Sequence, residues 1–235
     1  RKSLRQLYRD VYSQGRYPDL WFYWKGKPVI MAYPDNLVED DTDRRIAEFF
    51  TFRPGQPDYV NGPGRDDQWA WLENYPQNGY VQTGDGGFEE VTVGVAQNAG
   101  PMTHGHCSAF NLPGTFSRSF SQRNGFDPRM EGYLYGWNFQ EQWDRAREID
   151  PELVFVTGWN EFTAGMWRKE HGWSDPLSFV DQYNWDCSRD IEPNKGWGDR
   201  GDVYYVQLVD NVRRFKGMTP AETASAPKSI RLGAK

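Results

Sequence analysis

The sequence predicts an α/β fold in which parallel strands alternate with helices. Apolar, β-branched runs at residues 29–33, 89–96 and 153–157 are typical of strands buried on both faces of a parallel sheet, and residues 48–53 are expected to form a further strand. Long loops follow the carboxyl ends of these strands. Four such strands make half of an eight-stranded barrel. We therefore expect a (β/α)8, TIM-barrel-like fold of which this chain forms the second half.

Helices are expected between and after the strands, most of them with one apolar stripe. They cover residues 2–14, 43–48, 138–150 and 202–216. Gly15 and Gly217 end the first and the last, and Asp150-Pro151 stops the third. An open doubly wound sheet is the competing architecture, but no glycine-rich phosphate loop supports a nucleotide site in it.

Three regions are expected along the chain. Residues 1–217 would form the barrel portion, which corresponds to the C-terminal half of a catalytic domain. Residues 218–228 are small, polar and bounded by proline, which is the composition of a linker. Residues 229–235 would begin an appended β-domain.

Composition excludes some classes of partner and favours another. The net charge of −6 creates no field that attracts nucleic acid, and no apolar run reaches the roughly 18 residues of a membrane span. Yet 16% of the residues are aromatic although the mean hydropathy is −0.85. Rings among polar groups suit carbohydrate, and a ring-rich core accounts for about half of them. We expect a secreted or periplasmic protein, although no signal peptide opens the sequence.

The strongest candidate for a catalytic residue stands directly after a predicted strand. Residues 153–167 read LVFVTGWNEFTAGMW, so Trp159, Asn160 and Glu161 come at the carboxyl end of the strand, where barrel enzymes place their active sites. An indole offers a face for a sugar ring, a carboxamide a neutral hydrogen-bonding group, and a carboxylate an acid or base. A capping glutamate at an ordinary strand end is the alternative.

Other strand ends and loops supply further candidates for contact with a substrate. Each has a plainer explanation as well: turn chemistry for Asp35, ring packing for the tryptophans, and ion pairing with local acids for the arginines. The candidates are Tyr33, Asp35, Trp69, Trp71, Gln97, Asn98, His104, Arg118 and Arg123.

Metals and cofactors are not expected. The sequence His104-Gly-His106-Cys107 suggests zinc, but the chain has only three histidines and no second pair at ligand spacing. Cys107 and Cys187 allow either one disulfide or two buried thiols.

The motif at residues 157–162, TGWNEF, resembles the strand-end Asn-Glu motif of β/α-barrel glycoside hydrolases of families 71 and 99 and their uncharacterised bacterial relatives. Ile191-Glu192-Pro193 looks like the acidic motif that follows in that group, after an insertion of roughly 30 residues. Residues 26–33, GKPVIMAY, look like its fifth strand. In those families the principal carboxylates lie on the fourth strand, which would precede Arg1. The resemblance thus implies a partner half-barrel from the same parent chain, or different carboxylates.

These observations predict a glycosidase that acts on a polysaccharide or an oligosaccharide. Glycoside hydrolysis needs two carboxyl groups that flank the bond. We expect Glu161 to be the general acid, with a pKa raised by an apolar cleft, and Asp35 to be its partner. Glu192 and Asp67 are reserve candidates. A carbohydrate-binding domain without hydrolysis, or a purely structural ring-rich domain, would share the rings and amides.

Overall fold

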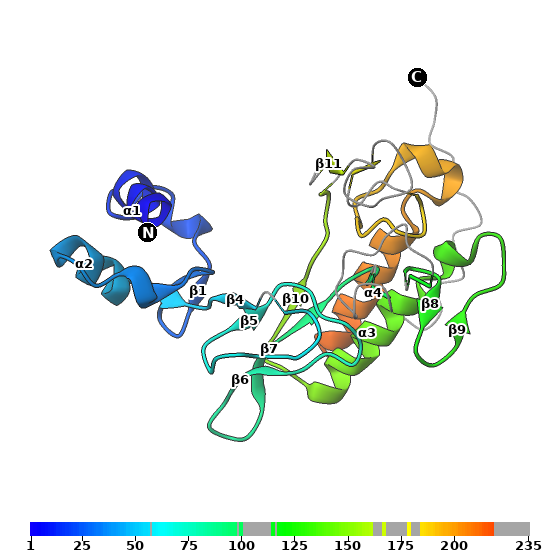
Figure 1. The fold of residues 1–235 in the computed structure, drawn as a ribbon, viewed down its shortest axis with the longest axis horizontal. Helices are drawn as coiled ribbons and strands as arrows, with labels where there is room; N and C mark the ends of the chain where they lie inside the picture. Colours follow the sequence, from blue (N-terminus) through cyan, green and yellow to red (C-terminus); the bar gives the residue numbers. More distant parts are fainter. Residues whose placement is uncertain are drawn as a thin grey trace.

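The computed structural model describes residues 1–56, 58–97, 99–100, 114–115, 117–161, 166–167, 178–179 and 184–218 (Figure 1). The α-helices are α1 (Lys2–Leu7), α2 (Asp41–Phe49), α3 (Trp137–Ile149) and α4 (Val203–Phe215). Shorter helical turns cover Tyr8–Tyr12, Pro18–Leu20, Pro34–Asn36, Gly132–Tyr135 and Lys195–Arg200. The strands are β1 (Tyr23–Trp24), β2 (Lys27–Ile30), β3 (Thr51–Phe52), β4 (Gly55–Gln56), β5 (Trp69–Ala70), β6 (Tyr80–Gln82), β7 (Phe88–Val93), β8 (Phe120–Ser121), β9 (Gly125–Phe126), β10 (Leu153–Val156), β11 (Met166–Trp167) and β12 (Ser178–Phe179).

These strands form short separate sheets, so the prediction of half a TIM barrel is wrong. The two larger sheets have the orders β1-β2-β3 and β10-β7-β6, and the remaining sheets are two-stranded. The described residues contain no closed barrel and form a small mixed α/β fold. The expectation of a partner half-barrel loses its basis with this correction. Parallel pairing does occur, between β2 and β3, between β4 and β5 and between β7 and β10, but each pair lies in a separate sheet.

Several predicted elements are confirmed. Strand β10 lies within the predicted residues 153–157, β7 overlaps the predicted strand at 89–96, and α3 and α4 match the predicted third and fourth helices. The predicted strand at 48–53 shrinks to β3, because α2 continues to Phe49 and buries Ile46 beside Phe50. Asp40 caps α2 by accepting hydrogen bonds from the backbone of the first turn.

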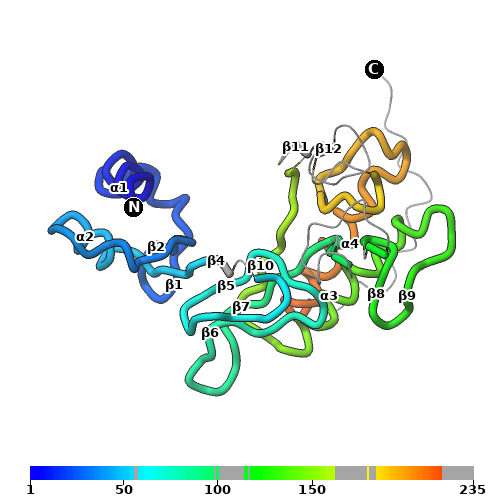
Figure 2. The backbone as a smooth tube through the Cα atoms, viewed as in Figure 1, coloured from blue at the N-terminus to red at the C-terminus, as the bar shows by residue number. Residues whose placement is uncertain are grey.

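The N-terminal unit has its own small core. Leu4, Leu37, Ile46 and Phe50 pack together beneath α1 and α2, which lie to one side of the rest of the chain (Figure 2). Asp43 is fully buried there, and it accepts hydrogen bonds from Arg1 at 3.0 Å and Arg5 at 2.7 Å. The hydrogen bond from Arg5 holds the pKa of Asp43 below its usual value. This buried carboxylate ties α1 to α2.

The main core lies between β7 and α3. Alternate residues of β7 face the buried stripe of α3, and α4 packs against the same core (Figure 1). The buried members are Val91, Val93, Val95, Phe139, Trp143, Ala146, Ile191 and Tyr204. Strand β10 is half-buried along its length, because Val154 and Val156 face this core while Phe155 turns to the ring of Trp71.

A side chain, not a backbone ladder, joins β5 to β7. The amide of Ala70 donates to Oε2 of Glu90 at 2.8 Å, and the hydroxyl of Thr92 donates to the carbonyl of Trp71 at 3.1 Å. The neighbouring Glu89 accepts two hydrogen bonds from Arg53, at 2.8 and 2.9 Å. Burial alone would raise the pKa of Glu89, but the contacts with Arg53, helped by indole hydrogen bonds, lower it.

Glu90 belongs to a buried acidic cluster that contains no basic group among the described residues. Glu73 and Tyr80 share the interior with it, and all three side chains are essentially inaccessible. Glu73 accepts hydrogen bonds from the backbone and side chain of Asn78 at 2.9 and 2.5 Å. Burial raises the pKa of Glu73 to about 7. Burial also raises the pKa of Glu90 well above its usual value, and the charge of Glu73 adds to the effect.

These pKa values predict a loss of stability with rising pH. Both carboxyls bind protons more tightly in the folded state, so their contribution is complete below about pH 4.5 and is lost as the pH rises through about 7 and beyond. Glu90→Gln keeps an acceptor for Ala70 and removes the ionisation. Urea unfolding at pH 5, 7 and 9 should show that the variant gains stability relative to the wild type as the pH rises. The exposed Glu48→Gln is the control, and an unchanged pH slope in Glu90→Gln would contradict the assignment.

Candidate functional site

The candidate site lies at the carboxyl ends of β7 and β10. The two strands are parallel, with Val156 opposite Val93, so they end at the same edge of the sheet. Thr157 extends the pairing by donating to the carbonyl of Val93 at 3.0 Å. Gly158 then turns the chain at φ +83°. A Cβ atom there would lie 2.1 Å from the carbonyl oxygen of Arg189, so only glycine fits this approach.

Two segments far apart in the sequence are bound together at this edge. The amide of Ile191 donates to the carbonyls of Gly158 at 2.9 Å and Trp159 at 3.1 Å, and the amide of Glu192 donates to Trp159 at 2.9 Å. The Oδ1 of Asp190 accepts from the amide of Glu161 at 2.6 Å. The structure therefore places Trp159, Asn160 and Glu161 beside the Ile191-Glu192-Pro193 motif. We call residues 158–161 and 190–192 together the strand-end joint.

The strand-end joint presents its candidate side chains to solvent. Trp159 is 46% exposed, and its ring meets that of Tyr205 edge-on at 6.1 Å. Asn160 and Glu161 are exposed, and Glu192 is half-buried. The described residues do not enclose the Glu161 carboxyl in the apolar cleft that the sequence analysis expects. A flat ring, an amide and carboxylates are thus accessible together.

Arg118 stabilises the strand-end joint from the protein interior. It is fully buried, with its guanidinium carbon 4.5 Å from the ring centre of Trp197 and 4.2 Å from that of Tyr204. Its Nη2 donates to the carbonyl of Asp190 at 2.5 Å and to the hydroxyl of Ser188 at 3.2 Å. A cation between two rings and a carbonyl orders the loop. The expectation that Arg118 binds an anionic substrate is therefore wrong for direct contact.

A buried thiol lies near Arg118, in the segment that leads to the strand-end joint. Cys187 is buried, and its sulfur is 3.4 Å from the hydroxyl oxygen of Ser117. Burial raises the pKa of this thiol to about 11. Of the two possibilities left open by the sequence, the structure assigns Cys187 a buried thiol.

Asp35 lies in a different cluster, so the proposed pairing with Glu161 is not seen. Its carboxylate meets Arg65 at 2.6 Å, and Arg65 also binds Asp67 at 2.9 Å. The Tyr33 hydroxyl donates to the carbonyl of Gly55 at 2.9 Å, and its ring lies 5.9 Å from the Arg65 guanidinium. Hydrogen bonding to Arg65 lowers the pKa of Asp67. The partner of Asp35 is thus a cation from the loop that contains Arg65 and Asp67.

The remaining predicted residues divide by exposure. Trp69 is 3% exposed and donates its Nε1–H to Glu89 at 3.2 Å, so it is a core residue and cannot stack on a sugar. Trp71 is 43% exposed, and its ring centre lies 5.5 Å from that of Phe155 on β10. Its exposed face therefore remains a candidate for stacking on a sugar. Gln97 is buried at the end of β7. Asn98 and His104 lie outside the described residues.

Sequence reasoning missed the part played by Asp190. Its side chain, buried and directed at the amide of Glu161, fixes the strand-end joint. The signal was its position immediately before Ile191-Glu192-Pro193, since aspartate often accepts hydrogen bonds from nearby backbone amides. Among the described side chains, no group of three or more His, Cys, Asp or Glu residues is placed to hold a metal ion. None of the described helices is long and apolar enough to cross a membrane.

Comparisons of the chain with protein-family models, curated proteins and solved structures found no match. The resemblance to glycoside hydrolases of families 71 and 99 thus depends on the short motifs alone.

The close approach at Gly158 predicts a specific cost for a methyl group. Gly158→Ala should lower the free energy of unfolding by about 2 kcal/mol or more, because positive φ strain adds to a clash with backbone. Gly217→Ala is the matched control, with φ +69° and open space around the added atom, and should cost about 1 kcal/mol. Equal losses for the two variants in urea unfolding would contradict the close packing.

The buried position of Arg118 predicts a structural, not a ligand-binding, phenotype. Arg118→Lys should lower the free energy of unfolding by about 2–4 kcal/mol, because the shorter ammonium loses the ring contacts and the fork of donors. The exposed Arg213→Lys should change it by less than about 0.5 kcal/mol. Normal stability combined with a lost affinity for an anionic glycan would return Arg118 to the list of ligands.

Proposed function

We propose that the protein is a glycoside hydrolase that acts on a polysaccharide or an oligosaccharide at the strand-end joint. One observation carries the proposal: residues 158–161 and 190–192 are hydrogen-bonded to each other at the carboxyl end of β10, and they present Trp159, Asn160 and Glu161 to solvent. The ring can lie against the CH face of a sugar while the amide binds its hydroxyls. Trp71 offers a second exposed indole beside the same strand.

Glu161 is the proposed acid and base of the reaction. As general acid it would protonate the glycosidic oxygen as the bond to the leaving sugar breaks, and a second carboxylate would activate water or attack the sugar carbon. Glu192 replaces Asp35 as the proposed second carboxylate. Its backbone is bonded to Trp159, two residues before Glu161, whereas Asp35 is held by Arg65 in another cluster.

Binding without hydrolysis is the second candidate, and the ion pair that holds Asp35 to Arg65 favours it. The rings and amides of the strand-end joint suffice to hold a glycan, and they need no pair of carboxylates. The two functions differ in whether reducing sugar is released.

The test is reducing-sugar release from a panel of soluble neutral and acidic polysaccharides. Glu161→Gln should lower kcat about 100-fold or more with little change in KM, because it removes proton transfer and leaves the ring and amide in place. Glu192→Gln should also lose turnover, while Asp35→Asn should retain it. The exposed Glu48→Gln is the control for the loss of one carboxylate.

The outcomes separate the candidates. Full turnover in Glu161→Gln would remove this residue from the chemistry. Loss of activity in Asp35→Asn with an active Glu192→Gln would restore the original pairing. Glycan binding that depends on Trp159 without any sugar release by the wild type would establish the binding function instead.

A further inference from the structure

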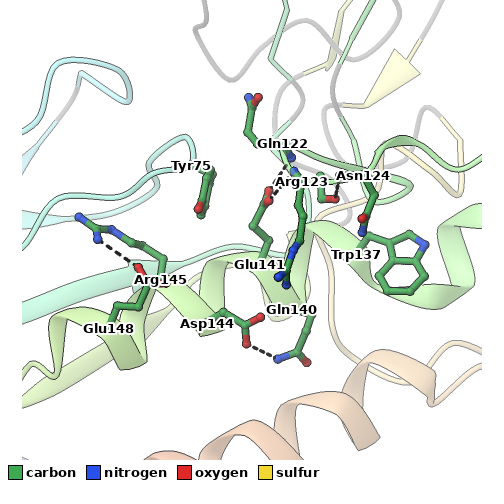
Figure 3. Close-up of a pocket in the computed structure, with 11 residues that line it drawn as sticks. Tyr75, Gln122, Arg123, Asn124, Trp137, Gln140, Glu141, Asp144, Arg145 and Glu148 are labelled. Carbon is green, nitrogen blue, oxygen red and sulfur yellow. Dashed lines mark hydrogen bonds and ion pairs between the residues drawn. The ribbon is translucent and has the colours of Figure 1, made fainter.

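A separate pocket lies along α3, away from the strand-end joint (Figure 3). Its volume is about 600 Å³, within the range of sites that hold small molecules. The floor is the polar face of α3 from Gln140 to Glu148, one wall is the turn between β8 and β9, and Tyr75 stands at the other end. The buried stripe of α3 faces β7, so this polar face is unused by the core.

The turn that forms the wall is anchored to the helix. The carboxylate of Glu141 accepts hydrogen bonds from the amides of Gln122 at 2.7 Å and Arg123 at 2.9 Å. The amide of Asn124 donates to the hydroxyl of Ser121 at 3.1 Å. These bonds hold the base of the Arg123 side chain in place before any ligand arrives, which lowers the entropy cost of binding.

Arg123 supplies an uncommitted cation to this pocket. The acids around it already have partners: Glu141 binds two backbone amides, Asp144 binds Arg147, and Glu148 binds Arg145 at 3.2 Å. Within the part of the chain that the structure describes, the guanidinium of Arg123 makes no hydrogen bond or ion pair. Figure 3 shows its side chain running beside Glu141 toward Gln140. A planar guanidinium matches a carboxylate with two parallel hydrogen bonds.

Trp137, the first residue of α3, also lines the pocket. Its Nε1–H donates to Asp127 at 2.8 Å, which fixes the plane of the ring, and the side chain of Asn124 lies close to it (Figure 3). A fixed indole in one pocket with a guanidinium and an amide provides a face for a pyranose ring, a partner for an acidic group and a partner for hydroxyls. The pocket therefore matches a ligand that is both a sugar and an anion.

We propose that the α3 pocket binds a sugar that carries a carboxylate, such as one uronic acid unit of an acidic polysaccharide. Arg123 takes the carboxylate, Trp137 lies against the ring, and Asn124 binds a hydroxyl. The proposal does not depend on hydrolysis at the strand-end joint, because the two sites share no residue.

The test is isothermal titration with a galacturonic acid trisaccharide and with the matching neutral galactose trisaccharide. The acidic sugar should bind the wild type at least about tenfold more tightly, and added salt should weaken it. Arg123→Gln should lose about tenfold or more in affinity for the acidic sugar and little for the neutral one. Arg44→Gln changes the net charge equally but lies on α2, so it should bind as the wild type does.

Three results would overturn the proposal. They are equal binding of the two trisaccharides, an equal loss in Arg44→Gln, and tighter binding of a triglutamate peptide than of the acidic sugar, which would indicate a site for acidic peptides. Glu161→Gln should leave the titration unchanged whether or not that residue is catalytic, so failure at one site is distinguishable from failure at the other.

Discussion

The carboxyl of Glu90 joins the two-stranded sheet of β4 and β5 to the central sheet of β10, β7 and β6. Strands β5 and β7 lie next to each other without a backbone ladder, and the bond from Ala70 to Glu90 takes the place of a rung. The pair formed by Arg53 and Glu89 repeats the arrangement one residue earlier on β7. A side chain thus links strands of two sheets that are not paired through their backbones.

The strand-end joint depends on a different device, a buried cation. Arg118 is held between Trp197 and Tyr204 and binds the carbonyl of Asp190, while the carboxylate of Asp190 binds the amide of Glu161. The exposed residues of the strand-end joint are thus held in place by successive contacts that begin at a buried arginine. Functional side chains need such support to keep their geometry. The sequence order of these residues gives no hint of their adjacency.

How far the sequence predicts the structure depends on the range of the interaction involved. Periodicity identified α3, α4, β7 and β10, because a buried stripe or an apolar run is a local property. The motif residues Trp159 to Glu161 were correctly placed at a strand end. The barrel was wrong because sheet closure depends on pairing between distant strands, which short apolar runs do not specify. Trp69 and Arg118 were misjudged for the same reason, since burial follows from tertiary packing.

Asp35 shows most clearly what the sequence alone does not predict. Its position after a predicted strand suggested an active-site acid. In the structure its carboxylate is instead bound by Arg65, which lies 30 residues later in the sequence. Local pattern cannot say which charge a carboxylate will meet. The α3 pocket was missed for a related reason: its residues come from two turns and a helix face that the sequence keeps well apart.

The thiol of Cys187 sits inside the support of the strand-end joint, next to Ser117, and is shielded from solvent. A thiol in this position reacts with an alkylating reagent only when the packing around it opens, because the reactive thiolate needs both water and access. The rate of labelling at this one sulfur would therefore report how often the buried residues beneath the strand-end joint become exposed to solvent.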